Sequence, residues 1–130
     1  MKFMLMMNAP RGTGDWGVMT WPAEDLKAHV QYMKKLNVDL RAAGELVAAE
    51  GLAPPDATRI VRAGKDGAPE VTDGPFAEAK EFLAGYWIVD VESAAQAYAI
   101  AARASLAPGP GGKPLHLAIE VREVMSAPPV

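Results

Sequence analysis

The chain has 130 residues, a hydrophobic fraction of 50% and a formal net charge of −3, values that fit one compact domain over residues 1–130. This composition excludes a disordered or fibrous chain, and the lack of cysteine excludes disulfides, thiol catalysis and cysteine-held metals. The acidic balance argues against direct binding of nucleic acid, and no apolar run is long enough to cross a membrane, so we expect a cytoplasmic protein.

The first third of the chain predicts a strand, a loop and a long helix. Met1–Asn8 is apolar without alternation, which is typical of a strand covered on both faces. Arg11–Thr20 is a glycine-rich loop, and a helix follows over Pro22–Ala43, with Thr20 as its cap and Gly44 as its stop. One apolar stripe runs along this helix, while its charged residues are expected to point away from the core, namely Lys27, Lys34, Lys35 and Asp39.

The middle of the chain predicts short strands separated by turns. Glu45–Gly51 is a strand, and a proline pair separates it from another at Thr58–Ala63. After a turn at Lys65–Pro69, a short strand at Glu70–Thr72 leads into Asp73-Gly74-Pro75. A helical turn is expected at Ala77–Glu81.

The last third predicts a strand at Leu83–Val89, a helix at Ser93–Arg103 with a capping box, and a final strand at Leu115–Val124. Ala107–Pro114 is a loop rich in proline and glycine. In the final strand, one face is expected to carry His116, Ala118, Glu120 and Arg122.

This order of elements predicts an α+β fold with a ferredoxin-like antiparallel sheet and two main helices on one face. Such a sheet leaves its second face open, yet Phe3–Met7 and Tyr86–Val89 are apolar on both faces. We therefore expect a homodimer that packs sheet on sheet, in the manner of a dimeric α+β barrel.

Asp73 is the first candidate for chemistry. A structural interpretation is that the aspartate bonds its own turn while proline opens the next segment. A functional interpretation is that the turn aims the carboxylate into a cleft, where partial burial suits it to act as a general base.

His29 is the second candidate. Asp25 lies one helical turn before it, where a carboxylate could orient the imidazole for acid–base catalysis. A buried histidine that is hydrogen-bonded only for stability is the alternative.

We expect the site in a cleft between the sheet and the first helix, with His29 and Asp73 as catalytic residues. The side chains expected to bind an unknown small molecule there are Trp16, Trp21, Tyr32, Phe76, Lys80 and Tyr86. The two histidines have no short-spaced ligand set and there is no glycine-rich phosphate turn, so we expect no metal and no cofactor.

The segment VTDGPFAEAKE at Val71–Glu81 resembles the signature of the DGPF branch of the YCII-related family. The likeness extends in order over further segments, namely Met1–Met6, Ala42–Leu46, Glu50–Leu52, Gly85–Val91 and Ile119–Arg122. The resemblance implies a dimeric ferredoxin-like α+β barrel. Some relatives are associated with extracytoplasmic-function sigma factors, and some act without a cofactor on chlorinated aromatic rings through a His–Asp pair. His29 lies about one helical turn earlier than the histidine of that pair.

Two functions follow as hypotheses. One is a cofactor-independent acid–base enzyme, a lyase or hydrolase, that acts on a small cyclic or aromatic molecule through Asp73 or His29. The other is a binding or regulatory module without turnover, associated with a sigma factor. Conversion of a bound ligand would favour the enzyme.

Overall fold

A computed structural model describes residues 1–11, 20–76 and 78–125. The elements in chain order are β1 (Lys2–Pro10), α1 (Ala23–Ala42), β2 (Leu46–Gly51), β3 (Arg59–Ala63), β4 (Pro69–Asp73), β5 (Glu81–Asp90), α2 (Ala94–Ser105) and β6 (Ile119–Glu123). Four strands form an antiparallel sheet in the order β2-β5-β1-β6, while β3 and β4 pair with each other in a separate hairpin. This is the ferredoxin-like α+β arrangement that the sequence predicts.

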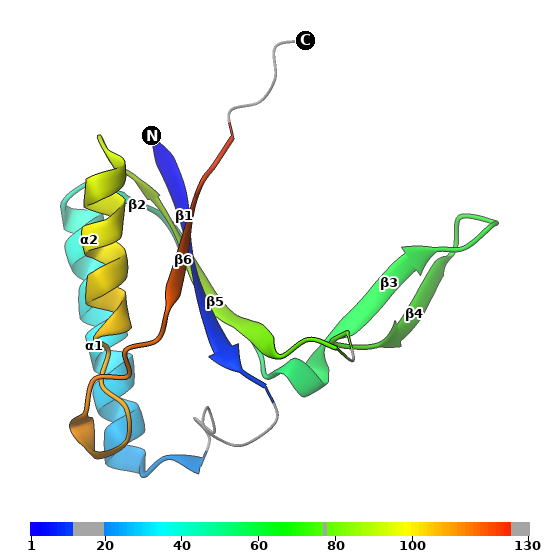
Figure 1. Ribbon diagram of the computed structural model, residues 1–130, viewed down its shortest axis with the longest axis horizontal. Coiled ribbons are helices and arrows are strands. Elements are labelled where there is room, and N and C mark those ends of the chain that lie inside the picture. Colours follow the sequence, from blue (N-terminus) through cyan, green and yellow to red (C-terminus); the bar gives the residue numbers. More distant parts are fainter. Residues whose placement is uncertain (12–19, 77, 126–130) are drawn as a thin grey trace.

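The molecule has two layers and a projecting arm. Both helices cover the same face of the sheet, and the β3–β4 hairpin extends away from the sheet on the opposite side (Figure 1). The described part of the chain therefore places no α-helix on the second face of the sheet.

β1 shows how the layers divide its side chains. Phe3, Leu5 and Met7 are buried under the helices, while Met4 and Met6 alternate with them and stay partly exposed on the other face. The sequence predicts cover on both faces, but a single chain covers only one, because its two helices lie on the same side. The second face is left with an apolar centre.

The core fills the space between the helices and the sheet. Leu36 of α1 is completely buried against Leu5 and Val89, and Leu40 is nearly so. α2 contributes mostly small residues, and its buried side chains are Ala97, Ile100, Ala101 and Ala104. Small side chains let a helix approach the sheet closely, so the pattern explains why an alanine-rich segment packs here.

The helix ends follow local sequence signals with one exception. Gly44 stops α1 with a φ of +73°, and the Ser93 side chain accepts a hydrogen bond from the backbone N–H of Gln96 at 3.3 Å. The Gln96 side chain returns to the N–H of Glu92 at 2.7 Å. Thr20 is not the cap of α1, because the helix begins after Pro22 and has no side-chain cap bond.

Two sequence predictions about the later chain are wrong. The last strand begins at Ile119 rather than Leu115, because His116 has a φ of +52° and leaves the extended conformation. His116 therefore does not share a strand face with Glu120 and Arg122. The expected helical turn at 77–81 does not form in its described residues, since Glu81 already belongs to β5 and pairs with Pro10.

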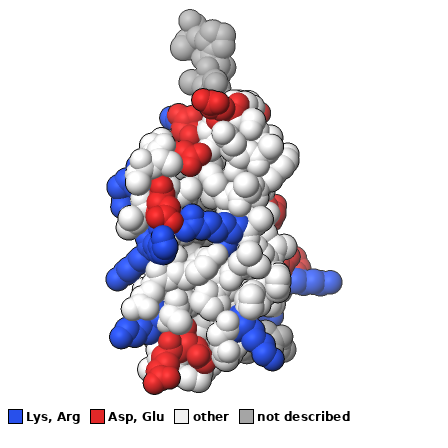
Figure 2. All heavy atoms as spheres, turned by 90° about the vertical axis from the view of Figure 1, so that its left-hand side faces the viewer, with Lys and Arg blue, Asp and Glu red and all other residues white. Residues whose placement is uncertain are grey.

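The outer face of the helix layer carries acidic and basic side chains interspersed (Figure 2). The face in view thus lacks the single-sign stripe that follows a phosphate backbone. Within the residues described, neither helix combines the length and apolar character needed to cross a membrane.

Asp39 joins the two helices through charge. The guanidinium of Arg103 on α2 donates to Asp39 Oδ2, and Lys35 Nζ donates to the same oxygen at 3.1 Å. Tyr32 adds a further link, because its hydroxyl donates to the carbonyl of Arg103 at 2.7 Å. The contacts of Asp39 with Arg103 and Lys35 lower the pKa of Asp39 below its ordinary value. The hydrogen bond from Arg103 is the largest cause, and the hydrogen bond from Lys35 is the next.

We expect Asp39→Asn to lower the urea midpoint at pH 7. A carboxyl whose pKa is lower in the folded state stabilises the fold above its unfolded pKa, and this contribution is lost as the pH falls through the folded pKa. The midpoints of the variant and the wild type should therefore converge as the solution is acidified. Asp56→Asn is the control, since its side chain makes no hydrogen bond or ion pair among the residues described. A difference between the urea midpoints of the variant and the wild type that stays constant at low pH would contradict this account.

Candidate functional site

A cavity of about 550 Å³ lies between α1 and the sheet, near the edge strand β2. Small-molecule sites usually occupy roughly 300–1,000 Å³ and have apolar walls with a few polar groups, and this cavity fits that description. Its apolar wall includes Met7, Val30, Met33, Phe82, Ala84 and Trp87, and the segment after β2 adds Leu52, Pro54 and Pro55.

His29 is the one buried polar residue among those described, with 8% of its surface exposed. It lines the cavity from α1. Its Nδ1 atom lies 3.0 Å from the carbonyl oxygen of Pro108, and a carbonyl can only accept, so Nδ1 carries the proton. In the neutral ring, Nε2 is then unprotonated and basic. The geometry thus holds the histidine in the tautomer that can accept a proton at Nε2.

The neighbours of His29 differ from those expected in one respect. Trp21 packs against the imidazole in an edge-to-face arrangement, with 5.4 Å between the ring centroids. Asp25 does not hold the Nδ1 atom, because its carboxylate accepts from the backbone N–H of Gly111 at 3.1 Å. Asp25 and His29 therefore each anchor α1 to the 107–114 loop, and a carbonyl orients the ring.

Asn37 is the second oriented polar group on the cavity wall. The indole Nε1 of Trp87 donates to Asn37 Oδ1 at 2.9 Å. An indole N–H is a donor only, so the contact fixes which end of the amide is oxygen. The NH₂ group of Asn37 is left as a donor for a ligand.

Two charged residues border the cavity from opposite elements. Lys34 lies on α1, three residues before Asn37, and Glu50 lies on β2. In the described part of the chain neither forms a salt bridge, so they do not pair with each other. Lys34 is exposed, as the sequence predicts, and it also borders the rim of the cavity.

Asp73 lies apart from this cavity. It is the last residue of β4, its side chain is 93% exposed, and Oδ1 stands 3.5 Å from Arg59 Nε. It borders a second, more open hollow, together with Arg11, Pro55, Asp56, Arg59, Gly74 and Pro75. The structure thus does not bring Asp73 and His29 to one cleft within a single chain.

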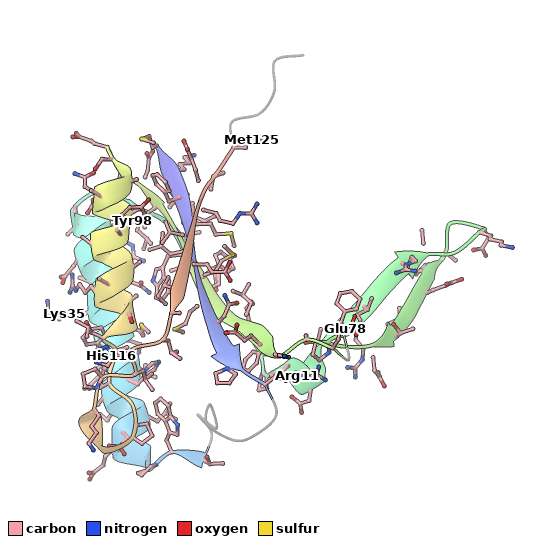
Figure 3. The ribbon with its side chains drawn as sticks, in the orientation of Figure 1. Arg11, Lys35, Glu78, Tyr98, His116 and Met125 are labelled. Atoms are coloured by element: carbon pink, nitrogen blue, oxygen red, sulfur yellow. The ribbon has the colours of Figure 1, made fainter. Side chains whose placement is uncertain are left out.

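The turn after Asp73 is held by Arg11. The Arg11 side chain donates to the carbonyls of Phe76 at 2.8 Å and of Ala79 at 3.2 Å, and Figure 3 shows Arg11 where β1 meets the base of the hairpin. Phe76 is 59% exposed, and Lys80 is exposed as well. Neither side chain borders the main cavity.

The remaining residues that the sequence predicts for the site do not all lie at the cavity. Tyr86 borders the cavity from β5, but its side chain alternates with that of buried Trp87 and so lies on the second face of the sheet. Trp21 packs on His29 without bordering the cavity itself, and the Tyr32 hydroxyl donates to the carbonyl of Arg103 on α2. Trp16 lies outside the described residues. Among the described residues there is no group of three His, Asp or Glu side chains that could hold a metal.

Sequence reasoning missed Lys34 and Asn37 as site residues. The two residues are three apart, about one helical turn, so they share one flank of α1, while His29 lies about 80–140° around the helix from them. That spacing was the available signal for the pair, but the charge of Lys34 predicts a position that faces solvent.

The model of one protein family, described as the YCII-related domain, matches residues 1–111 of the chain. A comparison with curated proteins finds no match.

Proposed function

Since the chain belongs to the YCII-related family, we propose that it is a cofactor-independent acid–base enzyme that acts on a small cyclic or aromatic molecule in the cytoplasm. The observation that carries the proposal is His29, a buried histidine with a fixed tautomer on the wall of an apolar cavity. A general base needs this combination of defined orientation and access to a bound molecule.

The walls of the cavity favour a ring compound. Phe82 and Trp87 of β5 line it together with Val30 and Met33 of α1. Aromatic and thioether groups pack well against a planar ring, and few polar groups compete with it. A volume of about 550 Å³ accommodates one or two small rings with substituents.

The role of His29 is to remove a proton from the bound molecule and to return one later in the reaction. The carbonyl of Pro108 fixes the ring through Nδ1 and stabilises the imidazolium that forms when Nε2 accepts a proton. Such a residue supplies roughly 10²- to 10⁴-fold of rate. This is consistent with a lyase step, in which a leaving group departs as the proton is removed, or with a hydrolytic step, in which His29 takes the proton of the attacking water.

The experiment is an incubation of the protein with a panel of phenols, aromatic acids and small lactones, followed by NMR for binding and for conversion. We expect at least one compound to shift the resonances of residues around the cavity and to be converted without an added cofactor. Binding without conversion would instead favour the second candidate below. No binding by any compound would contradict both.

A binding or regulatory module without turnover is the second candidate. It is favoured by the separation of Asp73 from His29, because a single chain then assembles only one acid–base group in the cavity. In this proposal the bound molecule is a signal, and a sigma factor is the partner that responds.

A homodimer is the assembly that the open sheet face supports. Met4 pairs with Ile88 and Met6 with Tyr86 in the β1–β5 register, so these four partly exposed side chains gather on one face. An apolar patch with polar residues around it is typical of an interface. A two-fold axis would pack this face on its copy.

We expect light scattering to give twice the chain mass at micromolar concentration, and Met6→Arg to give the monomer mass. A charge in the centre of an apolar interface loses its hydration without gaining a partner. Val38→Arg, on the exposed side of α1, is the matched control and should stay dimeric. A monomeric wild type would overturn the dimer but not the fold.

A further inference from the structure

The geometry points to a carboxylate subsite at the end of the cavity that lies away from His29, formed by Asn37 and Lys34. We infer that the ligand is an aromatic carboxylic acid whose ring lies beside His29 and whose carboxylate reaches this subsite. The inference rests on the proposed function, since it names the class of molecule that the same cavity takes.

The polar groups of α1 stand at two separate levels of the cavity. His29 and Asn37 are eight residues apart, which is about 12 Å along a helix axis. Between these levels α1 presents Val30 and Met33 to the cavity, both apolar. A ligand that satisfies both levels therefore has an apolar centre with a polar group at each end.

Asn37 offers the hydrogen-bond donors of its NH₂ group, while its Oδ1 already accepts one hydrogen bond. Its Oδ1 is engaged by Trp87 Nε1 at 2.9 Å, so the NH₂ group is the part that can meet a ligand. A carboxylate or carbonyl oxygen satisfies such a donor, whereas a ligand hydroxyl would have to accept through its oxygen. The amide thus selects for an acceptor at this level.

Lys34 supplies the charge that distinguishes a carboxylate from a neutral carbonyl. It lies one turn before Asn37, and residues three apart are neighbours on a helix surface. No carboxylate pairs with its ammonium within the residues described, so an anionic ligand group would be its counter-ion. Together the two side chains offer a charge and a directed donor, as carboxylate sites commonly do.

Glu50 of β2 borders the same cavity, but it pairs with Tyr86, so its side chain extends from the second face of the sheet and opposes this attraction from a greater distance. The presence of Glu50 predicts that charge removal at the two residues changes carboxylate affinity in opposite directions, which a site that selects by shape alone would not show. Removal of the Glu50 charge should strengthen the binding of a carboxylate, while removal of the Lys34 charge should weaken it.

The test is calorimetric titration with 4-hydroxycinnamate and with 4-hydroxycinnamyl alcohol, which share one ring and differ in the terminal group. We expect the wild type to bind the carboxylate more tightly than the alcohol. Asn37→Asp retains an oxygen for Trp87 but replaces the donor with a negative charge. It should weaken carboxylate binding by about 10- to 100-fold and change alcohol binding by less than about threefold, because charged hydrogen bonds are worth roughly 1.5–3 kcal/mol.

Two charge variants complete the test. Lys34→Gln should weaken carboxylate binding about two- to fivefold, as is typical of exposed pairs, and Glu50→Gln should strengthen it by a smaller factor, because the Glu50 side chain lies on the second face of the sheet. Equal affinity of the wild type for both probes, with no discrimination by Asn37→Asp, would overturn the subsite and leave the proposed cavity function intact. If neither probe nor any other ring compound bound, the proposed function itself would fail.

Discussion

Replacement of His29 by asparagine should lower turnover of the substrate identified from the panel by about 10²- to 10⁴-fold, while the melting temperature stays close to that of the wild type. The amide nitrogen of asparagine takes the place of Nδ1 and can still donate to the carbonyl of Pro108, 3.0 Å away from Nδ1 in the wild type. The basic Nε2 atom is removed. This variant therefore separates the catalytic role of the residue from its structural role.

His29→Ala is the companion variant, because it removes both the base and the bond to Pro108. We expect it to lose the same activity and, in addition, stability, since the Pro108 carbonyl would lose its partner. Substrate affinity, measured by titration, should change far less than the rate in the asparagine variant.

His116→Asn is the matched control for both variants. His116 is exposed, lies outside the cavity, and has a φ of +52°, a conformation that asparagine tolerates. The turnover rate of His116→Asn should remain that of the wild type. Full activity in His29→Asn would show that His29 only fastens the 107–114 loop to α1, and the binding module would then be the better proposal.

The two helices could be predicted because their signals are local. The apolar repeat and Gly44 define the end of α1, and Ser93 with Gln96 defines the start of α2. The start of β6 could not be predicted, since the apolar alternation continues through Leu117 while the backbone at His116 turns to positive φ. Alternation reports which side chains face the core and says nothing of where the strand pairing begins.

The candidate site could be predicted in part for the same reason. Helical periodicity brings His29 to the sheet, but it does not tell which neighbouring element each side chain meets. Tyr32 is only three residues further on and bonds to α2. Asp25 reaches Gly111, whose place beside α1 depends on the path of a loop 86 residues later in the chain.

Asp73 shows the larger limit of sequence reasoning. Its turn could be recognised, but the direction of the β3–β4 hairpin is set where the chain leaves β2 and enters β5. The hairpin projects from the sheet, so Asp73 ends beside Arg59 in solvent instead of over the cavity (Figure 1). A signature locates a segment in the sequence, and the tertiary path decides what that segment faces.

Leu36→Ala should lower the free energy of unfolding by about 2–5 kcal/mol, measured by urea denaturation. Leu36 is fully buried and packs α1 onto the sheet beside Leu5 and Val89. The truncation removes apolar contacts and leaves a void that a close-packed core fills poorly. Because Leu36 precedes Asn37, the loosened helix should also weaken ligand binding in the cavity.

Val38→Ala is the control for this change, since it truncates an apolar residue two positions further along the same helix. Val38 is 57% exposed, and alanine is the better helix former, so stability should stay within about 0.5 kcal/mol of the wild type. If Leu36→Ala were as mild as the control, α1 would not be held by the core contacts described above. The positions of His29 and Asn37 would then need a different support, and the bonds to Pro108 and Trp87 would have to provide it.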